Sequence, residues 1–146
     1  YLRQGRLLHR IFSAIHTSDD VEPLIQRMEM EGLFGSHMSV TDVKRIITHA
    51  LTHPQGATWF TREWQLFNEQ AIIFRKGEET HLRRPDRVML SSDGQKIVVV
   101  DFKFGNPRES YNAQVKEYMQ LLSHMGYPEV KGYLWYVYKG EIHEVR

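Results

Sequence analysis

An unbroken run of β-branched residues, 97–100, constrains the fold of this chain more than any other feature. Asp93-Gly94 stands just before it, and this pair is a strong signal for a hairpin turn. We therefore predict a strand over residues 96–104 that pairs with the segment on the other side of the turn. The strand is expected to lie in the middle of a sheet.

The same strand is predicted to carry polar groups on one of its faces. Side chains alternate along a strand, so Asp101 and Lys103 leave one face together. Asp86, on the predicted neighbouring strand, can reach that face. The opposite face, which a helix can cover, takes the apolar side chains Val98, Val100 and Phe102.

The N-terminal third has helical periodicity. Its apolar residues recur at spacings of three, four and one: Leu2, Leu7, Leu8, Ile11, Phe12 and Ile15. A second helix is predicted over residues 21–31, ended by Gly32. Ser39 followed by Asp42 predicts the start of a third helix, which stops before Pro54.

Beyond Pro54 the pattern changes to short runs of β-branched and aromatic residues. We predict a strand over residues 66–74, a turn over 75–78 and a partner strand over 81–90, which precede the 96–104 strand. After that strand we predict a helix over residues 111–124 and two strands over 132–138 and 142–145. The predicted fold class is α/β (α+β). Its order is helix, three antiparallel strands, helix, strand, with extra N-terminal helices.

Length and composition narrow the classes of function. The 146 residues suit one domain, and a net charge of +1 gives no long-range attraction to nucleic acid. The absence of cysteine excludes disulfides, thiolate metal sites and thiol catalysis. No apolar run is long enough for a membrane span, and no phosphate-binding Gly-x-x-x-x-Gly-Lys motif occurs, so no nucleotide site is expected in this chain. Because it begins at Tyr1, we expect a fragment of a longer chain.

Two carboxylates and an ammonium group on adjacent strands suggest metal-assisted hydrolysis of phosphodiesters. Mg²⁺ prefers oxygen ligands and keeps several waters, so Asp86 and Asp101 with substrate phosphate oxygens would suffice to bind it. The metal would activate a water and offset the developing negative charge. Lys103 can position that water, deprotonate it or stabilise the transition state.

Pro85-Asp86 followed by Asp101-Phe102-Lys103 resembles the signature of the PD-(D/E)xK nuclease superfamily. Gly5-x-x-x-His9 and Gln114-x-x-x-Tyr118 resemble two elements of its RecB-like branch. The likeness is closest to the C-terminal nuclease domain of bacterial RecB- or AddA-type helicase-nucleases. It implies a restriction-endonuclease-like core.

The resemblance also implies roles for individual residues. The implied ligands of Mg²⁺, or of Mn²⁺ as its substitute, are Asp86, Asp101, His9 and the backbone carbonyl of Phe102. Lys103 would be the catalytic lysine, with Glu69 supporting the metal or its water. The residues expected to line the site and contact DNA are Gln114, Tyr118, Arg84 and Arg87; nearby basic residues that could clamp phosphates are Arg83, Arg108 and Lys116.

Some residues admit a second interpretation. Glu63 competes with Glu69 for the acidic position on the first strand, and Glu69 is preferred because it directly precedes an apolar run. His49 and His53 have helical metal-ligand spacing but no third ligand, so we interpret them as structural. The aromatic residues 59–67 are expected to serve core packing rather than base stacking.

The resemblance predicts a Mg²⁺-dependent exonuclease acting on DNA within an ATP-dependent helicase-nuclease for double-strand-break repair. Its partners would be helicase domains of the parent chain and a second helicase-nuclease subunit, in the bacterial cytoplasm and without a membrane. The alternative is a catalytically inactive nuclease-like module for DNA binding or subunit docking. A nuclease acting alone in repair or restriction is a third possibility.

Overall fold

A computed structural model describes residues 2–35, 38–67 and 72–146. Its α-helices are α1 (Leu2–Ala14), α2 (Val21–Met30), α3 (Val40–Ala50) and α4 (Glu109–His124). Its strands are β1 (Gln65–Phe67), β2 (Ile72–Lys76), β3 (Glu79–Arg83), β4 (Arg87–Leu90), β5 (Lys96–Lys103), β6 (Glu129–Tyr136) and β7 (Glu141–Val145). In the described part of the chain, no helix combines the length and the apolar character needed to cross a membrane.

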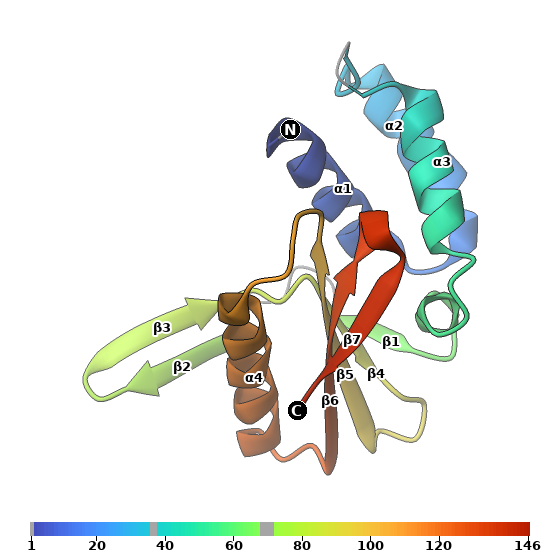
Figure 1. Cartoon of the computed structure of the whole chain (residues 1–146). Helices are drawn as coiled ribbons and strands as arrows, with labels where there is room; N and C mark the ends of the chain where they lie inside the picture. The colour runs from blue at the N-terminus through green and yellow to red at the C-terminus, as the bar shows by residue number, and fades with distance from the viewer. Residues whose placement is uncertain (1, 36–37, 68–71) are drawn as a thin grey trace.

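Five of the strands form one mixed sheet, in the order β1-β4-β5-β6-β7 (Figure 1). β4 is antiparallel to both of its neighbours, β1 and β5, β6 runs parallel to β5, and β7 is antiparallel to β6. A parallel neighbour requires a crossover, and α4 provides it between β5 and β6. The predicted order of helix, three antiparallel strands, helix and strand is confirmed, as is the mixed α/β class.

The sheet is covered on both faces, with β5 at its centre. One core cluster joins Val98, Val100 and Phe102 to α1 and α3, and the other joins Ile97 and Val99 to α4. On α1 the fully buried side chains follow the predicted stripe, namely Leu8, Ile11 and Phe12, with Ile15 just beyond the helix. The helix expected to cover the Val98 face is therefore α1.

Local sequence signals account for two helix positions. Ser39 caps α3 as predicted: its hydroxyl accepts a hydrogen bond from the N–H of Asp42 at 3.1 Å, and the Asp42 carboxylate accepts one from the N–H of Ser39. Gly132 on β6 lets α4 approach closely. A Cβ there would lie 2.5 Å from Met119 Sδ and 2.7 Å from Val115 Cγ1.

The predicted long strands 66–74 and 81–90 are each wrong as single elements. The first is replaced by β1 in the main sheet and β2 in a separate hairpin, and the second by β3 and β4. Pro85 interrupts the second, because it has no N–H to donate to a ladder. The β2–β3 hairpin therefore leaves the sheet beside α4 (Figure 1).

Smaller differences concern element ends. The hairpin turn is shorter than predicted, because Lys76 already pairs with Glu79 across Gly77, whose φ is 67°. Strand β6 begins at Glu129 and ends at Tyr136, so Tyr138 lies in a short 3-10 turn. The predicted structural role of His53 is supported, since its Nδ1 accepts hydrogen bonds from the N–H groups of Gln55 and Gly56.

Candidate active site

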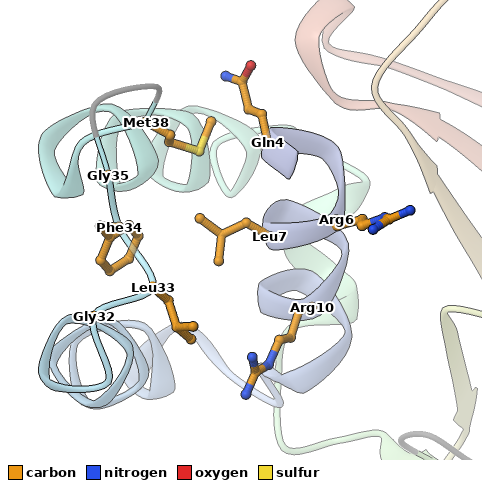
Figure 2. A pocket seen from close by; sticks show the side chains of 9 residues that line it. All are labelled: Gln4, Arg6, Leu7, Arg10, Gly32, Leu33, Phe34, Gly35 and Met38. Atoms are coloured by element: carbon orange, nitrogen blue, oxygen red, sulfur yellow. The ribbon is translucent and has the colours of Figure 1, made fainter. Parts of the chain in front are cut away.

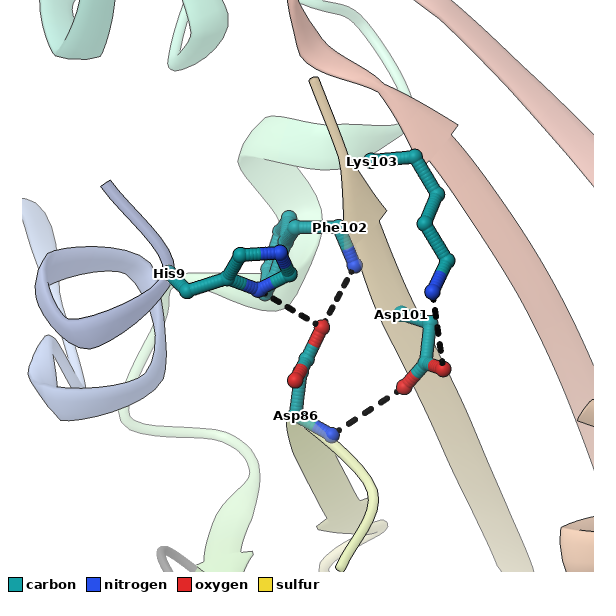
Figure 3. Close-up of polar contacts among 5 residues, drawn as sticks. All are labelled: His9, Asp86, Asp101, Phe102 and Lys103. Carbon is teal, nitrogen blue, oxygen red and sulfur yellow. Dashed lines mark hydrogen bonds and ion pairs between the residues drawn. The ribbon is translucent and has the colours of Figure 1, made fainter. Parts of the chain in front are cut away.

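The C-terminal end of β5 and the bend before β4 bring the polar residues together (Figure 3). Asp86 lies in that bend rather than on a strand, which corrects the expectation from sequence. Ladder pairing between β4 and β5 ends at Arg87 and Val100, one residue short of both aspartates. The two carboxylates are therefore placed where the sheet opens.

Each aspartate accepts a hydrogen bond from the opposing backbone. The N–H of Asp86 donates to Asp101 Oδ1 at 3.1 Å, and the N–H of Phe102 donates to Asp86 Oδ2 at 2.9 Å. These two bonds replace the ladder bonds that the bend removes, so the N–H groups of Asp86 and Phe102 are both satisfied. They fix the two carboxylates relative to each other without using a cation.

Asp101 is almost completely buried, with 3% of its surface exposed. Burial and the nearby Asp86 carboxylate raise its pKa to about 6, while the Asp86 N–H, Lys103 and His9 act in the opposite direction. A buried carboxylate that lacks a full counter-charge attracts a cation. This is the electrostatic condition that a divalent metal would relieve.

Lys103 lies beside Asp101 on the same face of β5, as the alternation predicted. Its Nζ is 3.8 Å from Asp101 Oδ2 and 4.3 Å from the centroid of the Tyr111 ring. Only 16% of the lysine side chain is exposed. The ammonium group is thus held between a carboxylate and the face of an aromatic ring.

Tyr111 was not singled out from the sequence. A signal existed, because Tyr111, Gln114 and Tyr118 follow spacings of three and four and so form one stripe on α4. From this stripe Tyr111 presents a ring to Lys103, while Gln114 and Tyr118 carry an amide and a hydroxyl.

His9 approaches the site from α1. Its Nδ1 lies 3.1 Å from Asp86 Oδ2, and its ring packs edge-on against Phe104 at 5.0 Å between centroids. The contact with Asp86 lacks hydrogen-bond alignment, so Nδ1 is a buried polar atom without a hydrogen-bond partner. Two ligands of one octahedral Mg²⁺, each about 2.1 Å from it, would lie about 3 Å apart if adjacent. The separation of these two atoms therefore suits a shared cation.

The donor chemistry fits a divalent cation, although the donors do not form a closed set. Among residues 2–35, 38–67 and 72–146, no group of three or more His, Cys, Asp or Glu side chains is arranged as a metal site. Asp101 explains this, since its Oδ1 faces the Asp86 N–H and its Oδ2 faces Lys103. His9 and Asp86 form the more open half of the site.

Tyr118 of α4 interacts with the charges of Asp86 and Asp101 and with the side chain of Gln114. Burial and the carboxylates of Asp101 and Asp86 raise the pKa of Tyr118, and a hydrogen bond with the Gln114 side chain opposes this rise. The Tyr118 side chain is 2% exposed, so it lines the site from the core. The neutral hydroxyl is held close to two carboxylates that it can help to orient.

Arg87 does not face the site, and its predicted contact with DNA is wrong. The residue is fully buried on the α1 side of the sheet. Its guanidinium donates hydrogen bonds to four backbone carbonyls and lies 4.0 Å above the ring of Phe60; the carbonyls belong to Phe12, Ile15, His16 and Trp59. Cross-strand pairing explains this, because Arg87 lies opposite Val100, whose side chain packs on the α1 side, and paired residues share a face of the sheet.

Arg84 lies on the open side of the site. It lines a hollow of about 410 Å³ together with His9, Arg10, Ser13, Pro85 and Asp86. Arg84 is exposed, so its guanidinium is accessible to an anion in this hollow. Glu69 falls outside the described residues, and Glu63 is exposed in a turn before β1.

A second cavity of about 410 Å³ lies between α1 and the loop that follows α2 (Figure 2). Its walls include Leu7, Leu33, Phe34 and Met38, with Arg6 and Arg10 at its side. Among the described residues that line it, none has a carboxylate or an imidazole, which are the groups that the polar cluster provides. The chemistry of the chain is therefore placed at the cluster around Asp86 and Asp101.

A comparison with models of known protein families matches residues 1–145 to the PD-(D/E)XK nuclease superfamily. The chain belongs to this superfamily. The match spans the fold from α1 to β7 and includes both halves of the polar cluster. Nucleases of the superfamily typically use divalent metals such as Mg²⁺. A comparison with curated proteins gave no match.

Proposed function

We propose that this domain hydrolyses phosphodiester bonds of DNA with the help of a divalent metal. One observation supports the proposal most strongly: Asp86 and Asp101 are held together by backbone N–H groups while Lys103 lies 3.8 Å from Asp101. Backbone amides keep the two carboxylates in place and leave charge on them for a cation. A domain that only bound DNA would gain nothing from two carboxylates beside the phosphates.

The proposed metal ligands are the carboxylates of Asp86 and Asp101, His9 Nδ1 and the backbone carbonyl of Phe102. When bound, Mg²⁺ or Mn²⁺ lowers the pKa of a coordinated water and offsets charge on the phosphate. Glu69 is proposed to support this water. Its role stays a prediction, because the residue lies outside the described part of the chain.

Lys103 is the proposed catalytic ammonium group. It is held against Asp101 and the Tyr111 ring, so it is oriented before substrate arrives. From there it would donate a hydrogen bond to the attacking water or to a phosphate oxygen. Gln114 and Tyr118 would keep the carboxylates in place, and Arg84 would contact a phosphate in the hollow beside His9.

We further propose that the domain is an exonuclease within an ATP-dependent helicase-nuclease for double-strand-break repair. The support is the resemblance of the His9 and Gln114/Tyr118 motifs to the RecB-like branch. The partners would then be helicase domains of the parent chain and a second subunit, in the bacterial cytoplasm. A module that binds DNA or a subunit without catalysis is the competing proposal.

The decisive experiment incubates labelled linear and circular DNA with the 146-residue chain in Mg²⁺, Mn²⁺ or EDTA. Lys103→Ala and Asp101→Ala are compared with Lys96→Ala, a matched control on the same strand. We expect metal-dependent cleavage that both site variants lose and the control retains. Loss of linear but not circular DNA would support exonuclease action. Binding of DNA without cleavage in either metal would favour the inactive module.

A further inference from the structure

A long groove runs between α4 and the β2–β3 hairpin, away from the hollow at His9. It has a volume of about 620 Å³. The hairpin contributes Arg75, Lys76, His81 and Arg83, and α4 contributes residues that include Lys116 and His124. Figure 1 shows the hairpin beside this helix.

The groove concentrates positive charge in a chain that has almost none overall. Among its described lining residues are four Lys or Arg and one acidic residue, Glu117, which pairs with Arg83 at 3.3 Å. With histidines neutral, the lining has a formal charge of +3, whereas the whole chain has +1. The rest of the chain therefore sums to a net negative formal charge, and a polyanion would favour this groove.

The groove begins next to the proposed active site. Arg83 ends β3, three residues before Asp86, and its charge acts on Tyr118. On α4 the lining positions Ala113, Lys116, Gln120 and His124 recur every three or four residues. They form a stripe next to the one that holds Gln114 and Tyr118, so the groove follows the helix from the site outward.

We propose that this groove binds the sugar–phosphate backbone of single-stranded DNA beyond the cleaved bond. The inference rests on the proposed function, in which DNA is the substrate. A volume of this size suits a short length of one strand, whereas a duplex would have to lie across the rims. Its exposed cations, Arg75, Lys76 and Lys116, suit phosphate oxygens, so we expect the groove to contact the backbone of the strand. Binding here is independent of base sequence.

The test measures fluorescence anisotropy of a labelled 20-nucleotide single strand of mixed sequence in EDTA, over a range of NaCl concentrations. The groove variant combines Arg75→Ala, Lys76→Ala and Lys116→Ala. The control variant combines Arg27→Ala, Lys44→Ala and Arg45→Ala on α2 and α3, which removes the same charge elsewhere. All six side chains are at least partly exposed, so both variants should fold. Lys116→Ala alone is a second probe, because alanine favours the helix.

We expect the groove variant to raise Kd at least tenfold at 100 mM NaCl and the control to raise it less than threefold. The slope of log K against log salt should fall by about 2 in the groove variant, since each lost phosphate contact removes about 0.7. Equal weakening by both triple variants would overturn the proposal. Equal weakening of single-stranded and blunt duplex binding would overturn the assignment to a single strand.

Failure of this proposal is distinguishable from failure of the proposed function. Binding in EDTA requires no cleavage, so a groove effect in a chain that never cuts DNA would support the groove and contradict the nuclease. If wild type cuts DNA and the groove variant cuts it with an unchanged KM, the groove proposal is wrong and the nuclease stands.

Discussion

Asp101 is a buried acid whose charge opposes folding. Its pKa is raised to about 6 from 3.8, so the folded chain binds the extra proton between these values. The free energy of unfolding therefore falls as pH rises through this window, by about 3 kcal/mol at most for this group. Asp101 lies where its charge weakens the fold, as expected of a group that serves a site.

We expect Asp101→Asn to abolish metal-dependent cleavage and to stabilise the fold by about 1 to 2 kcal/mol at pH 7.5 in EDTA. The gain is smaller than the full charge effect because Lys103 loses a partner. Thermal unfolding from pH 3.5 to 8 tests this, and the advantage should vanish below about pH 4. Asp19→Asn, at an exposed position near the start of α2, should give neither effect. A less stable Asp101→Asn at pH 7.5 would contradict the argument.

Tyr111 is a positioning residue for Lys103. Replacing the ring by Tyr111→Leu should lower kcat about two- to fivefold with little change in KM, because a cation–π contact contributes about 0.5–1 kcal/mol. Tyr111→Phe keeps the ring face and should behave as wild type. Steady-state kinetics on labelled DNA measures both. If Phe is as impaired as Leu, the hydroxyl rather than the ring is responsible.

The buried Arg87 holds α1 and β4, the two elements nearest His9 and Asp86, against each other. Arg87 connects the end of α1 to β4, since it donates hydrogen bonds to one carbonyl in the last turn of the helix and to two just beyond it. Burial lowers its pKa to about 9, which still leaves the guanidinium charged at neutral pH. His9 lies on α1 and Asp86 directly precedes β4. The hydrogen bonds of Arg87 between these elements therefore help to keep His9 Nδ1 3.1 Å from Asp86 Oδ2.

Arg87→Met should therefore cost at least about 3 kcal/mol, because several buried carbonyls lose their donor. The expected fall in Tm is about 10 °C for a chain of this size. Arg62→Met, at an exposed arginine, is the control and should change Tm by less than 2 °C. A similar Tm for both variants would show that the carbonyls find other donors.

The packing of α4 on β6 depends on Gly132. In Gly132→Ala the new methyl group meets Val115, a stiff β-branched side chain, so α4 must move outward. We expect a loss of about 1 to 3 kcal/mol and a lower kcat, since α4 positions Tyr111, Gln114 and Tyr118. Gly105→Ala, where a methyl group meets nothing within 4 Å, is the matched control. Unfolding curves and cleavage rates test both.

The whole molecule combines a buried sheet with a hairpin that stands apart from it. Strand β5 is buried over six consecutive residues, whereas β2 and β3 pair with each other in a separate two-stranded sheet. Ile73 and Leu82 of the hairpin form a cross-strand pair and are 67% and 50% exposed. A hairpin with so little burial gains little from hydrophobic packing.

We therefore expect amides of β2 and β3 to exchange with solvent at least a hundredfold faster than those of β5 and β6. Hydrogen exchange followed by mass spectrometry measures this in the free chain. A single strand in the groove should slow exchange in the hairpin and leave β5 unchanged. Equal protection of the hairpin and β5 in the free chain would contradict this view.

Local sequence patterns determined much of this protein. The β-branched run with its Asp-Gly turn predicts β5, the Ser39 capping box predicts the start of α3, and alternation along β5 puts Asp101 beside Lys103. These features depend on neighbours in sequence, and backbone geometry then fixes which face each side chain takes. The metal-binding and catalytic roles of the residues stay predictions.

Only the tertiary structure decided which elements meet. The bend at Pro85 divides the predicted long hairpin between two sheets, places Asp86 off the strand and sends Arg87 into the core. The contact of Tyr111 with Lys103 and the basic groove likewise join segments that are separate in sequence. Such contacts depend on how helices pack across a sheet, which is set by summed burial over the whole chain. No local pattern of residues specifies that sum.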